Sequence, residues 1–177
     1  MSEPSLESYI IDVPDYPEPG VIFKDITPLL DNPKGLAMTV DKLADHFVGK
    51  GITKIVGAEA RGFLLGSAVA YRLNAGFVPA RKPGKLPREV YSQDYALEYG
   101  VDQLEIHRDA MGPDDRVLIV DDLIATGGTA KAMGHLVEKA GASIVGFAVI
   151  LELEYLHPAE YMADSFPQEI FSLIKVS

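Results

Sequence analysis

The stretch that most constrains the fold is residues 117–129, which read VLIVDDLIATGGT. Its first four residues are apolar and predict a buried strand of a parallel sheet, because such strands read as continuous apolar runs bounded by turn residues. Two carboxylates, Asp121 and Asp122, follow this run, and a loop at 123–128 leads to a helical pattern that begins at Thr129. Open α/β sheets bind ligands at the carboxyl ends of their strands, so these carboxylates mark a candidate site.

The loop after the carboxylates is rich in small residues, so its backbone can approach a ligand closely. Its N–H groups and the start of the next helix predict an anion site suited to phosphate. Together with carboxylates that accept sugar hydroxyls, this suits a ribose 5-phosphate. The alternative is a strand that ends in an ordinary capped helix, with Asp122 as a turn residue. No GxxxxGK followed by Ser or Thr is present, and no GxGxxG follows a strand, so nucleoside triphosphatase and dinucleotide-binding interpretations lack support.

This motif resembles the signature of the type I phosphoribosyltransferases, which bind phosphoribosyl pyrophosphate. The resemblance implies that Asp121 and Asp122 face the 2′- and 3′-hydroxyls of the ribose. It also implies a loop that binds the 5′-phosphate through backbone N–H groups and threonine hydroxyls. The residues of that loop are Ala125, Thr126, Gly127, Gly128 and Thr129.

A second motif, GAEARGF at residues 57–63, runs from an expected strand end into a helix. Since all strands of a parallel sheet point one way, Glu59 and Arg61 would lie on the same rim as Asp122. In the resemblance, Glu59, Ala60 and Arg61 form a pyrophosphate-binding loop with a cis peptide bond between Glu59 and Ala60. The alternative is a plain helix N-terminus with Glu59 in its first turn and Arg61 on the surface.

A basic loop, RKPGKLPR at residues 81–88, stands out in a chain whose formal net charge is −10. Its prolines stiffen it, which favours an ordered loop that holds donors for phosphate oxygens over a merely solvated charged face. The resemblance implies that Lys82 and Lys85 contact the pyrophosphate. It also implies that Arg81 reaches across a dimer interface into the neighbouring site.

Two further segments narrow the resemblance to the adenine phosphoribosyltransferases: PGVIFKDIT at residues 19–27 and YALEYGVDQLEI at residues 95–106. The second segment implies a mobile lid, in which Glu98 exchanges a proton with adenine N7 and Tyr99 lies beside it. With Arg61 they make up the implied catalytic set. Without the resemblance, Glu98 would be read as a surface charge on an exposed hairpin.

The same resemblance places the base site in an N-terminal cap. The implied residues are Val21, Ile22, Phe23, Lys24 and Leu153. Adenine offers a 6-amino donor beside an N1 acceptor, which one backbone carbonyl and one backbone N–H can match. Guanine or hypoxanthine reverses the pattern at position 6 and would leave buried groups unpaired. For Phe23 the alternative is simple core packing.

Strand and helix patterns alternate along most of the chain. The strand patterns cover residues 54–58, 76–80, 117–120 and 144–151. The helical patterns cover residues 31–50 (capped by Asp31 or Asn32), 62–73 and 129–139. This alternation predicts an α/β fold in a single domain over residues 1–177, with a mostly parallel central sheet flanked by helices, as in the type I phosphoribosyltransferase fold.

Three segments depart from the alternation. Residues 89–99 and 103–108 predict a hairpin around Gly100, within a basic-loop and lid region at about 81–108. Residues 1–30 carry several prolines and are expected to be irregular and to contribute to a hood. Residues 154–177 are expected to be short and irregular, with a further strand near residues 170–176.

Composition excludes several partner classes. The net charge argues against general nucleic-acid or acidic-membrane affinity. The 177 residues include no cysteine, which excludes disulfides and thiolate chemistry and suits a cytoplasmic protein. The N-terminus lacks the features of a signal peptide, and no apolar run is long enough to span a bilayer.

The resemblance implies transfer of a phosphoribosyl group to adenine, which gives AMP and diphosphate in purine salvage. The chain shows no spacing of metal ligands, so we expect Mg²⁺ to arrive with the phosphoribosyl pyrophosphate and not on a protein-only site. The expected partners are adenine, the donor and a second copy in a homodimer. Two alternatives stay open: a regulator that senses phosphoribosyl pyrophosphate, and a transferase for another purine base such as xanthine.

Overall fold

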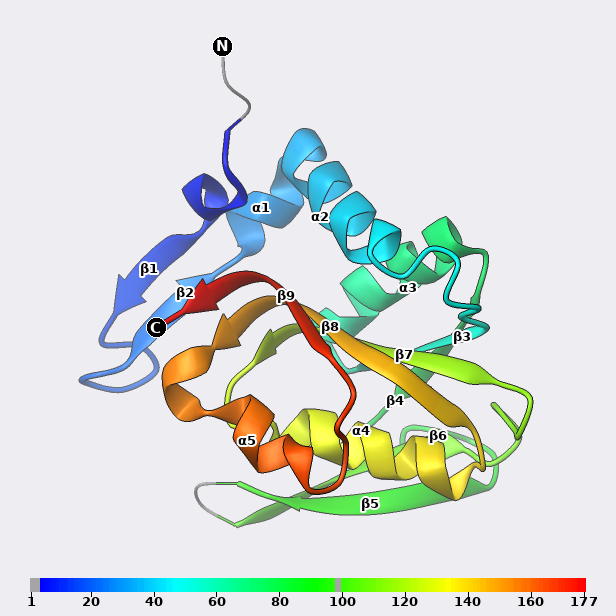
Figure 1. Cartoon of the computed structure of the whole chain (residues 1–177). Helices are drawn as coiled ribbons and strands as arrows, with labels where there is room; N and C mark the ends of the chain where they lie inside the picture. The colour runs from blue at the N-terminus through cyan, green and yellow to red at the C-terminus, as the bar shows by residue number, and fades with distance from the viewer. Residues whose placement is uncertain (1–3, 98–99) are drawn as a thin grey trace.

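The computed structural model describes residues 4–97 and 100–177. Its centre is a five-stranded sheet in the order β4–β3–β7–β8–β9, in which every neighbouring pair is parallel (Figure 1). These strands are β3 (Lys54–Ala58), β4 (Gly76–Ala80), β7 (Arg116–Ile124), β8 (Ser143–Leu153) and β9 (Ile170–Val176). The parallel α/β arrangement expected from the alternating pattern is confirmed.

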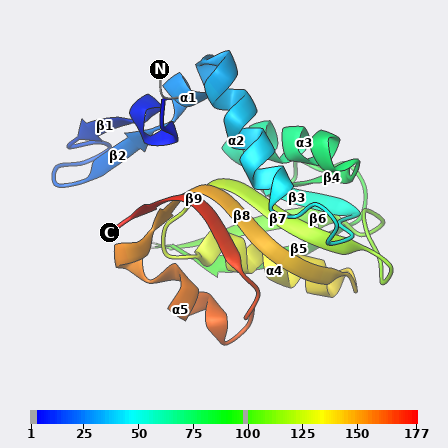
Figure 2. The ribbon, with the colours of Figure 1, turned by 45° about the horizontal axis from the view of Figure 1, so that its top comes forward.

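Helices cover both faces of the sheet (Figure 2). α2 (Pro33–Asp45) and α3 (Arg61–Leu73) pack on one face, and α4 (Gly128–Lys139) packs on the other. Alternate residues of β7 point to opposite faces of the sheet. Leu118 and Val120 pack in the core under α2 and α3, and Val117 and Ile119 pack in the core under α4. Within the described ranges, no helix is both long enough and apolar enough to cross a membrane.

The helix expected over residues 31–50 begins as predicted and ends early. Asn32 caps α2, because its Oδ1 accepts hydrogen bonds from the N–H groups two and three residues later, each at 3.0 Å. The helix ends at Asp45, and the N–H of Phe47 donates to the carbonyl of Ala44 at 2.9 Å in a tight turn. This turn buries Phe47 in the core, where its ring meets that of Phe171 edge to face.

The expectation that residues 1–30 are irregular is wrong. They form η1 (Leu6–Tyr9), the antiparallel strands β1 (Ile11–Pro14) and β2 (Ile22–Asp25), and α1 (Thr27–Asp31). Pro17 and Pro19 belong to the hairpin turn between β1 and β2, which the N–H of Gly20 closes by donating to Asp15 Oδ1 at 2.8 Å. This hairpin, the hood, lies beyond the carboxyl ends of β8 and β9 (Figure 1).

The hairpin expected around Gly100 is confirmed as β5 (Val90–Ala96) and β6 (Val101–His107), which pair antiparallel. Leu104 and Ile106 of β6 are buried in the core beneath α4. A two-residue bridge between Arg81 and Glu105 also attaches β6 to the chain just after β4. The hairpin is therefore tied both to a helix and to the basic loop.

Residues 154–177 are more regular than expected. They form η2 (Glu154–Leu156), α5 (Pro158–Ala163) and the predicted strand β9. α5 has only six residues, too few for a helical period to show in the sequence, and it begins with Pro158. It is held by Met162 and by Phe166 beyond it, which are buried in the core shared with α4.

β7 is longer than its apolar run. The sequence placed the loop at residue 123, but parallel pairing with β8 continues through Leu123 and Ile124. Pairing is possible there because β8 also continues, to Leu153. Asp121 and Asp122 consequently lie within the strand near its carboxyl end, and not after it.

Gly57 provides a test of how closely β3 and α3 pack. A Cβ at this position would lie 2.7 Å from the carbonyl oxygen of Gly62, which is backbone and cannot swing aside. Overpacking of this kind costs about 1–3 kcal/mol. We expect Gly57→Ala to lower the free energy of unfolding by this amount in urea denaturation, whereas Gly112→Ala, which meets no atom within 4 Å, serves as control. Equal stabilities of the two variants would contradict the close packing.

Candidate functional site

A pocket of about 340 Å³ lies at the carboxyl ends of β3 and β7. It brings together residues that the sequence assigned to separate motifs. The predicted site residues that line it are Glu59, Ala60, Arg61, Lys82, Asp121, Asp122, Ala125, Thr126, Gly127, Gly128 and Thr129. Tyr95, Ala96 and Leu97 of the β5–β6 hairpin also line the pocket.

The two carboxylates of β7 differ in their partners. Asp122 is 5% exposed, and its Oδ2 pairs with Arg61 Nε at 2.9 Å. Asp121 Oδ1 accepts a hydrogen bond from the N–H of Asp122 at 2.9 Å. Burial, and then the neighbouring charge of Asp122, raise the pKa of Asp121 well above its ordinary value, and the charge of Arg61 offsets only part of this.

The small-residue loop lies directly after β7 and leads into α4. Gly127 precedes the first residue of the helix with φ of +97°, a conformation that L side chains rarely adopt. α4 begins at Gly128, so the free N–H groups of its first turn lie at the pocket wall, together with Thr126 and Thr129. Free N–H groups at a helix start suit an anion.

The loop between β3 and α3 is arranged around Glu59. The peptide bond between Glu59 and Ala60 is cis, as the resemblance implies. Glu59 Oε1 accepts hydrogen bonds from the backbone N–H of Lys82 at 2.7 Å and from Arg81 Nε at 3.3 Å. Glu59 thereby fixes the start of the basic loop against the first turn of α3.

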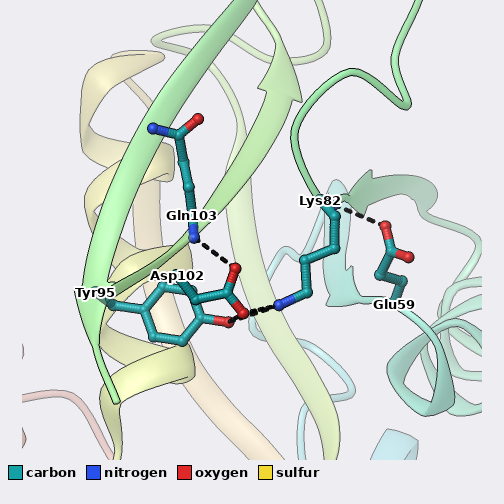
Figure 3. A network of polar contacts seen from close by, with 5 residues as sticks. All are labelled: Glu59, Lys82, Tyr95, Asp102 and Gln103. Atoms are coloured by element: carbon teal, nitrogen blue, oxygen red, sulfur yellow. Dashed lines mark hydrogen bonds and ion pairs between the residues drawn. The ribbon is translucent and has the colours of Figure 1, made fainter. Parts of the chain in front are cut away.

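The ammonium of Lys82 has two partners on the β5–β6 hairpin (Figure 3). It forms a short ion pair with Asp102 and donates to the hydroxyl of Tyr95 at 3.2 Å. Partial burial lowers the pKa of Lys82, but the hydrogen bonds and charges of Asp102 and Tyr95 outweigh it, so the pKa is raised. The hydrogen bond from Lys82 in turn lowers the pKa of Asp102, with help from the N–H of Gln103.

The rest of the basic loop is held by Glu105, a carboxylate that is only 9% exposed. Glu105 accepts from the N–H of Gly84 at 3.2 Å and from Ser92 Oγ at 3.3 Å. Lys85 is exposed and lies outside the pocket lining, as does Arg81, whose guanidinium faces Glu59 of its own chain. The loop is ordered, as its prolines indicated.

The residues expected to bind the base lie outside the lining of this pocket. Val21 uses both main-chain groups within the hood turn: its N–H donates to the carbonyl of Glu18 and its carbonyl accepts from the N–H of Tyr16, each at 3.2 Å. Lys24 pairs with Asp12 at 2.7 Å.

One contact places the hood beside the pocket. The guanidinium carbon of Arg61 lies 5.8 Å from the ring centroid of Phe23, which links the hood to the pocket. Ile22 is exposed, and Leu153 is half-buried at the end of β8.

Comparison with known proteins identifies the family. The model of the phosphoribosyl transferase domain matches residues 26–176. The adenine phosphoribosyltransferase of Koribacter versatilis is 52% identical over 170 residues, which cover 96% of this chain and 92% of that protein. The chain belongs to the adenine phosphoribosyltransferases. Its reaction is therefore the conversion of adenine and 5-phospho-α-D-ribose 1-diphosphate to AMP and diphosphate, in purine salvage.

Solved adenine phosphoribosyltransferases share the fold. The crystal structure from Thermoanaerobacter pseudethanolicus has a TM-score of 0.91 at 46% identity and covers 97% of this chain and 98% of that one. The structure from Saccharomyces cerevisiae, complexed with D-DIAB and adenine, has a TM-score of 0.88 at 38% identity and covers 96% of both chains. Neither the regulator nor a transferase for another base finds support in these relatives.

Sequence reasoning missed three residues of this adenine phosphoribosyltransferase: Tyr95, Asp102 and Glu105. A signal was present, since Tyr95 and Asp102 are equidistant from the hairpin turn and therefore face each other across β5 and β6. Their contact with Lys82 depends on tertiary packing and could not be read from spacing. The predicted catalytic residues Glu98 and Tyr99 lie outside the described residues.

The raised pKa of Asp121 predicts a cost in stability at neutral pH. A carboxyl whose pKa is raised by folding binds its proton more tightly in the native state, so stability falls as pH rises from the ordinary value through the raised one. We expect Asp121→Asn to be more stable than wild type in urea denaturation at about pH 8, with the gain vanishing near about pH 4.

The exposed Asp114 gives a control with the same change of charge, Asp114→Asn. A stability gain for Asp121→Asn that does not depend on pH, or that matches the control, would contradict the assignment of the cost to an ionised Asp121.

Proposed function

We propose that the pocket at the ends of β3 and β7 binds the phosphoribosyl donor of the adenine phosphoribosyltransferase reaction. Asp121 and Asp122 accept hydrogen bonds from the ribose hydroxyls, and residues 125–129 bind the 5′-phosphate. The observation that carries this proposal is that one pocket is lined by the two adjacent carboxylates of β7, a helix start with a small-residue loop, and two cations, Arg61 and Lys82. The carboxylates match the ribose hydroxyls, the helix start and its loop match the 5′-phosphate, and the cations match the diphosphate.

The diphosphate of the donor is assigned to the other side of the pocket. Arg61 and Lys82 supply positive charge there, and the loop of Glu59 and Ala60 positions them. Lys85 and Arg81 belong to the same basic loop but lie outside the pocket lining. Since the leaving diphosphate gains negative charge as the bond to the sugar breaks, preorganised cations at this place favour the transition state over the ground state.

Mg²⁺ is proposed to accompany the donor. The pocket is rich in oxygen ligands, which Mg²⁺ prefers, but Asp122 is already paired with Arg61, and Glu59 already accepts a hydrogen bond from the backbone N–H of Lys82. The ion is therefore assigned to the diphosphate, the sugar hydroxyls and water. When bound, it neutralises charge on the diphosphate.

Adenine is assigned to the space between the hood and the end of β8. Phe23 offers an aromatic face near Arg61, and Leu153 offers an apolar one. Backbone groups of residues 21–24 are proposed to read the 6-amino group and N1, with Ile22 and Lys24 beside them. Because both main-chain groups of Val21 are bonded within the hood turn, the neighbouring residues are the better candidates.

The β5–β6 hairpin is proposed to act as a lid, together with Glu98 and Tyr99, which follow Leu97 in the sequence. Glu98 would exchange a proton with adenine N7, and closure would exclude water from a sugar with oxocarbenium character at C1. Water exclusion matters because hydrolysis of the donor is the competing reaction. Tyr95, Ala96 and Leu97 of this hairpin line the pocket, which supports the assignment.

Asp122→Asn tests the ribose site. The substitution replaces a charged acceptor by a neutral amide and should weaken donor binding about ten- to a hundredfold, as expected for a hydrogen bond to a charged group. Calorimetric titration of the variant with phosphoribosyl pyrophosphate measures this. Asp109→Asn is the matched control, since Asp109 pairs with Arg88 at 3.0 Å but does not line the pocket. Unchanged affinity in Asp122→Asn would remove Asp122 from the ribose site.

The homodimer is proposed to form through α3. Leu64 and Tyr71 are 57% and 90% exposed and lie seven residues apart, so they share one face of the helix. α3 begins at Arg61 in the pocket, so a second copy seated on this face would lie near the pocket rim, where Arg81 could reach it.

We also assign the protein to the cytoplasm, on its lack of cysteine.

Tyr71→Asp should shift the protein from dimer to monomer, because a charge would have to be buried in the interface. Sedimentation velocity measures the shift. Tyr155→Asp is the control, since Tyr155 is also exposed but lies in η2. A Tyr71→Asp variant that sediments as wild type would exclude this face as the dimer interface.

A further inference from the structure

Lys82 is held at both ends, and by two different elements (Figure 3). Its backbone N–H donates to Glu59 Oε1 at 2.7 Å, which fixes the start of the side chain beside the loop of Ala60. Its ammonium pairs with Asp102 and donates to the hydroxyl of Tyr95. A lysine side chain has four rotatable methylene units, so this double anchoring removes most of the freedom that it would otherwise have.

The anchor on the β5–β6 hairpin is itself fixed. Tyr95 and Asp102 are direct partners across the two strands, and the Tyr95 hydroxyl donates to Asp102 Oδ2 at 3.2 Å. The other oxygen, Asp102 Oδ1, accepts from the N–H of Gln103 at 2.8 Å. Both oxygens of Asp102 are therefore oriented by hydrogen bonds, unlike those of an ordinary surface ion pair.

The donors of Lys82 leave room for a ligand. An ammonium has three N–H donors, and here Asp102 and Tyr95 accept two of them. Lys82 and Tyr95 line the pocket, and Asp102 does not. Asp102 thus holds the ammonium of Lys82 from outside the pocket lining and adds no carboxylate to the pocket wall.

We propose that Asp102 is a positioning residue for the diphosphate: with Tyr95 it fixes the ammonium of Lys82 at the pocket wall and leaves one N–H for a phosphate oxygen. The inference rests on the proposed contact of Lys82 with the diphosphate. Asp102 itself touches neither the donor nor the base. Its loss therefore affects diphosphate binding through Lys82 and leaves adenine binding unchanged.

Asp102→Asn tests this role with inorganic diphosphate and Mg²⁺ as the probe in calorimetric titrations. The affinity for diphosphate and 1/KM for the donor should each fall about tenfold, as for loss of one charged hydrogen-bond partner, while KM for adenine stays unchanged. Asp102→Glu keeps the charge and should recover part of the affinity. Asp94→Asn is the control on the same hairpin. Asp94 is exposed, and its Oδ1 accepts a hydrogen bond from Gln103 Nε2 at 2.6 Å.

A double-mutant cycle with Lys82→Met separates the positioning role of Asp102 from the proposed contact of Lys82 with the diphosphate. We expect Lys82→Met to weaken diphosphate binding, and the double variant Lys82→Met/Asp102→Asn to bind no more weakly than Lys82→Met alone. If Asp102→Asn binds diphosphate as well as wild type, or more tightly, the positioning role is wrong even where Lys82→Met weakens binding. Additive losses in the double variant would also overturn it, because Asp102 would then act without Lys82. If Lys82→Met binds diphosphate as tightly as wild type, the proposed contact of Lys82 with the diphosphate is itself wrong.

Discussion

The site depends on two adjacent carboxylates near the end of β7, of which Asp122 is buried and Asp121 is half-buried. Burial of like charges is costly, and the pKa of Asp121 is raised accordingly. The cost is limited by Arg61, which begins α3 and pairs with Asp122 at 2.9 Å. Since Arg61 follows β3 and the carboxylates lie on the neighbouring strand β7, the parallel pairing of these strands brings the three charges together. The order of strands in the sheet therefore determines which charged side chains meet in the pocket.

Much of this arrangement could be predicted from the sequence. The apolar run before Asp121, the cap at Asn32 and the hairpin around Gly100 are local signals, and local signals fix element type well. The motif residues from Glu59 to Arg61 and from Ala125 to Thr129 meet in one pocket, because parallel strands end on one edge of the sheet.

What could not be predicted depends on contacts between distant segments. The N-terminal hairpin looked irregular, because its prolines and Gly20 mark a turn and the pairing of β1 with β2 has to be known to see the strands. β7 continues past its apolar run only because β8 pairs with it. The ammonium partners of Lys82 likewise come from two other strands, since Tyr95 of β5 lies 13 residues and Asp102 of β6 lies 20 residues further along the chain. The three residues that sequence reasoning missed all act at such long-range contacts.

The pairing of the pocket cations has a consequence for how the substrate arrives. Arg61 and Lys82 are each matched by a carboxylate, Asp122 and Asp102, so they project little positive potential beyond the pocket. The chain as a whole carries a formal net charge of −10. A polyanionic donor is therefore not steered toward this enzyme from a distance, and added salt should screen repulsion more than attraction. Capture then depends on contacts made at short range, such as those of the remaining N–H of Lys82 and of the backbone N–H groups at the start of α4.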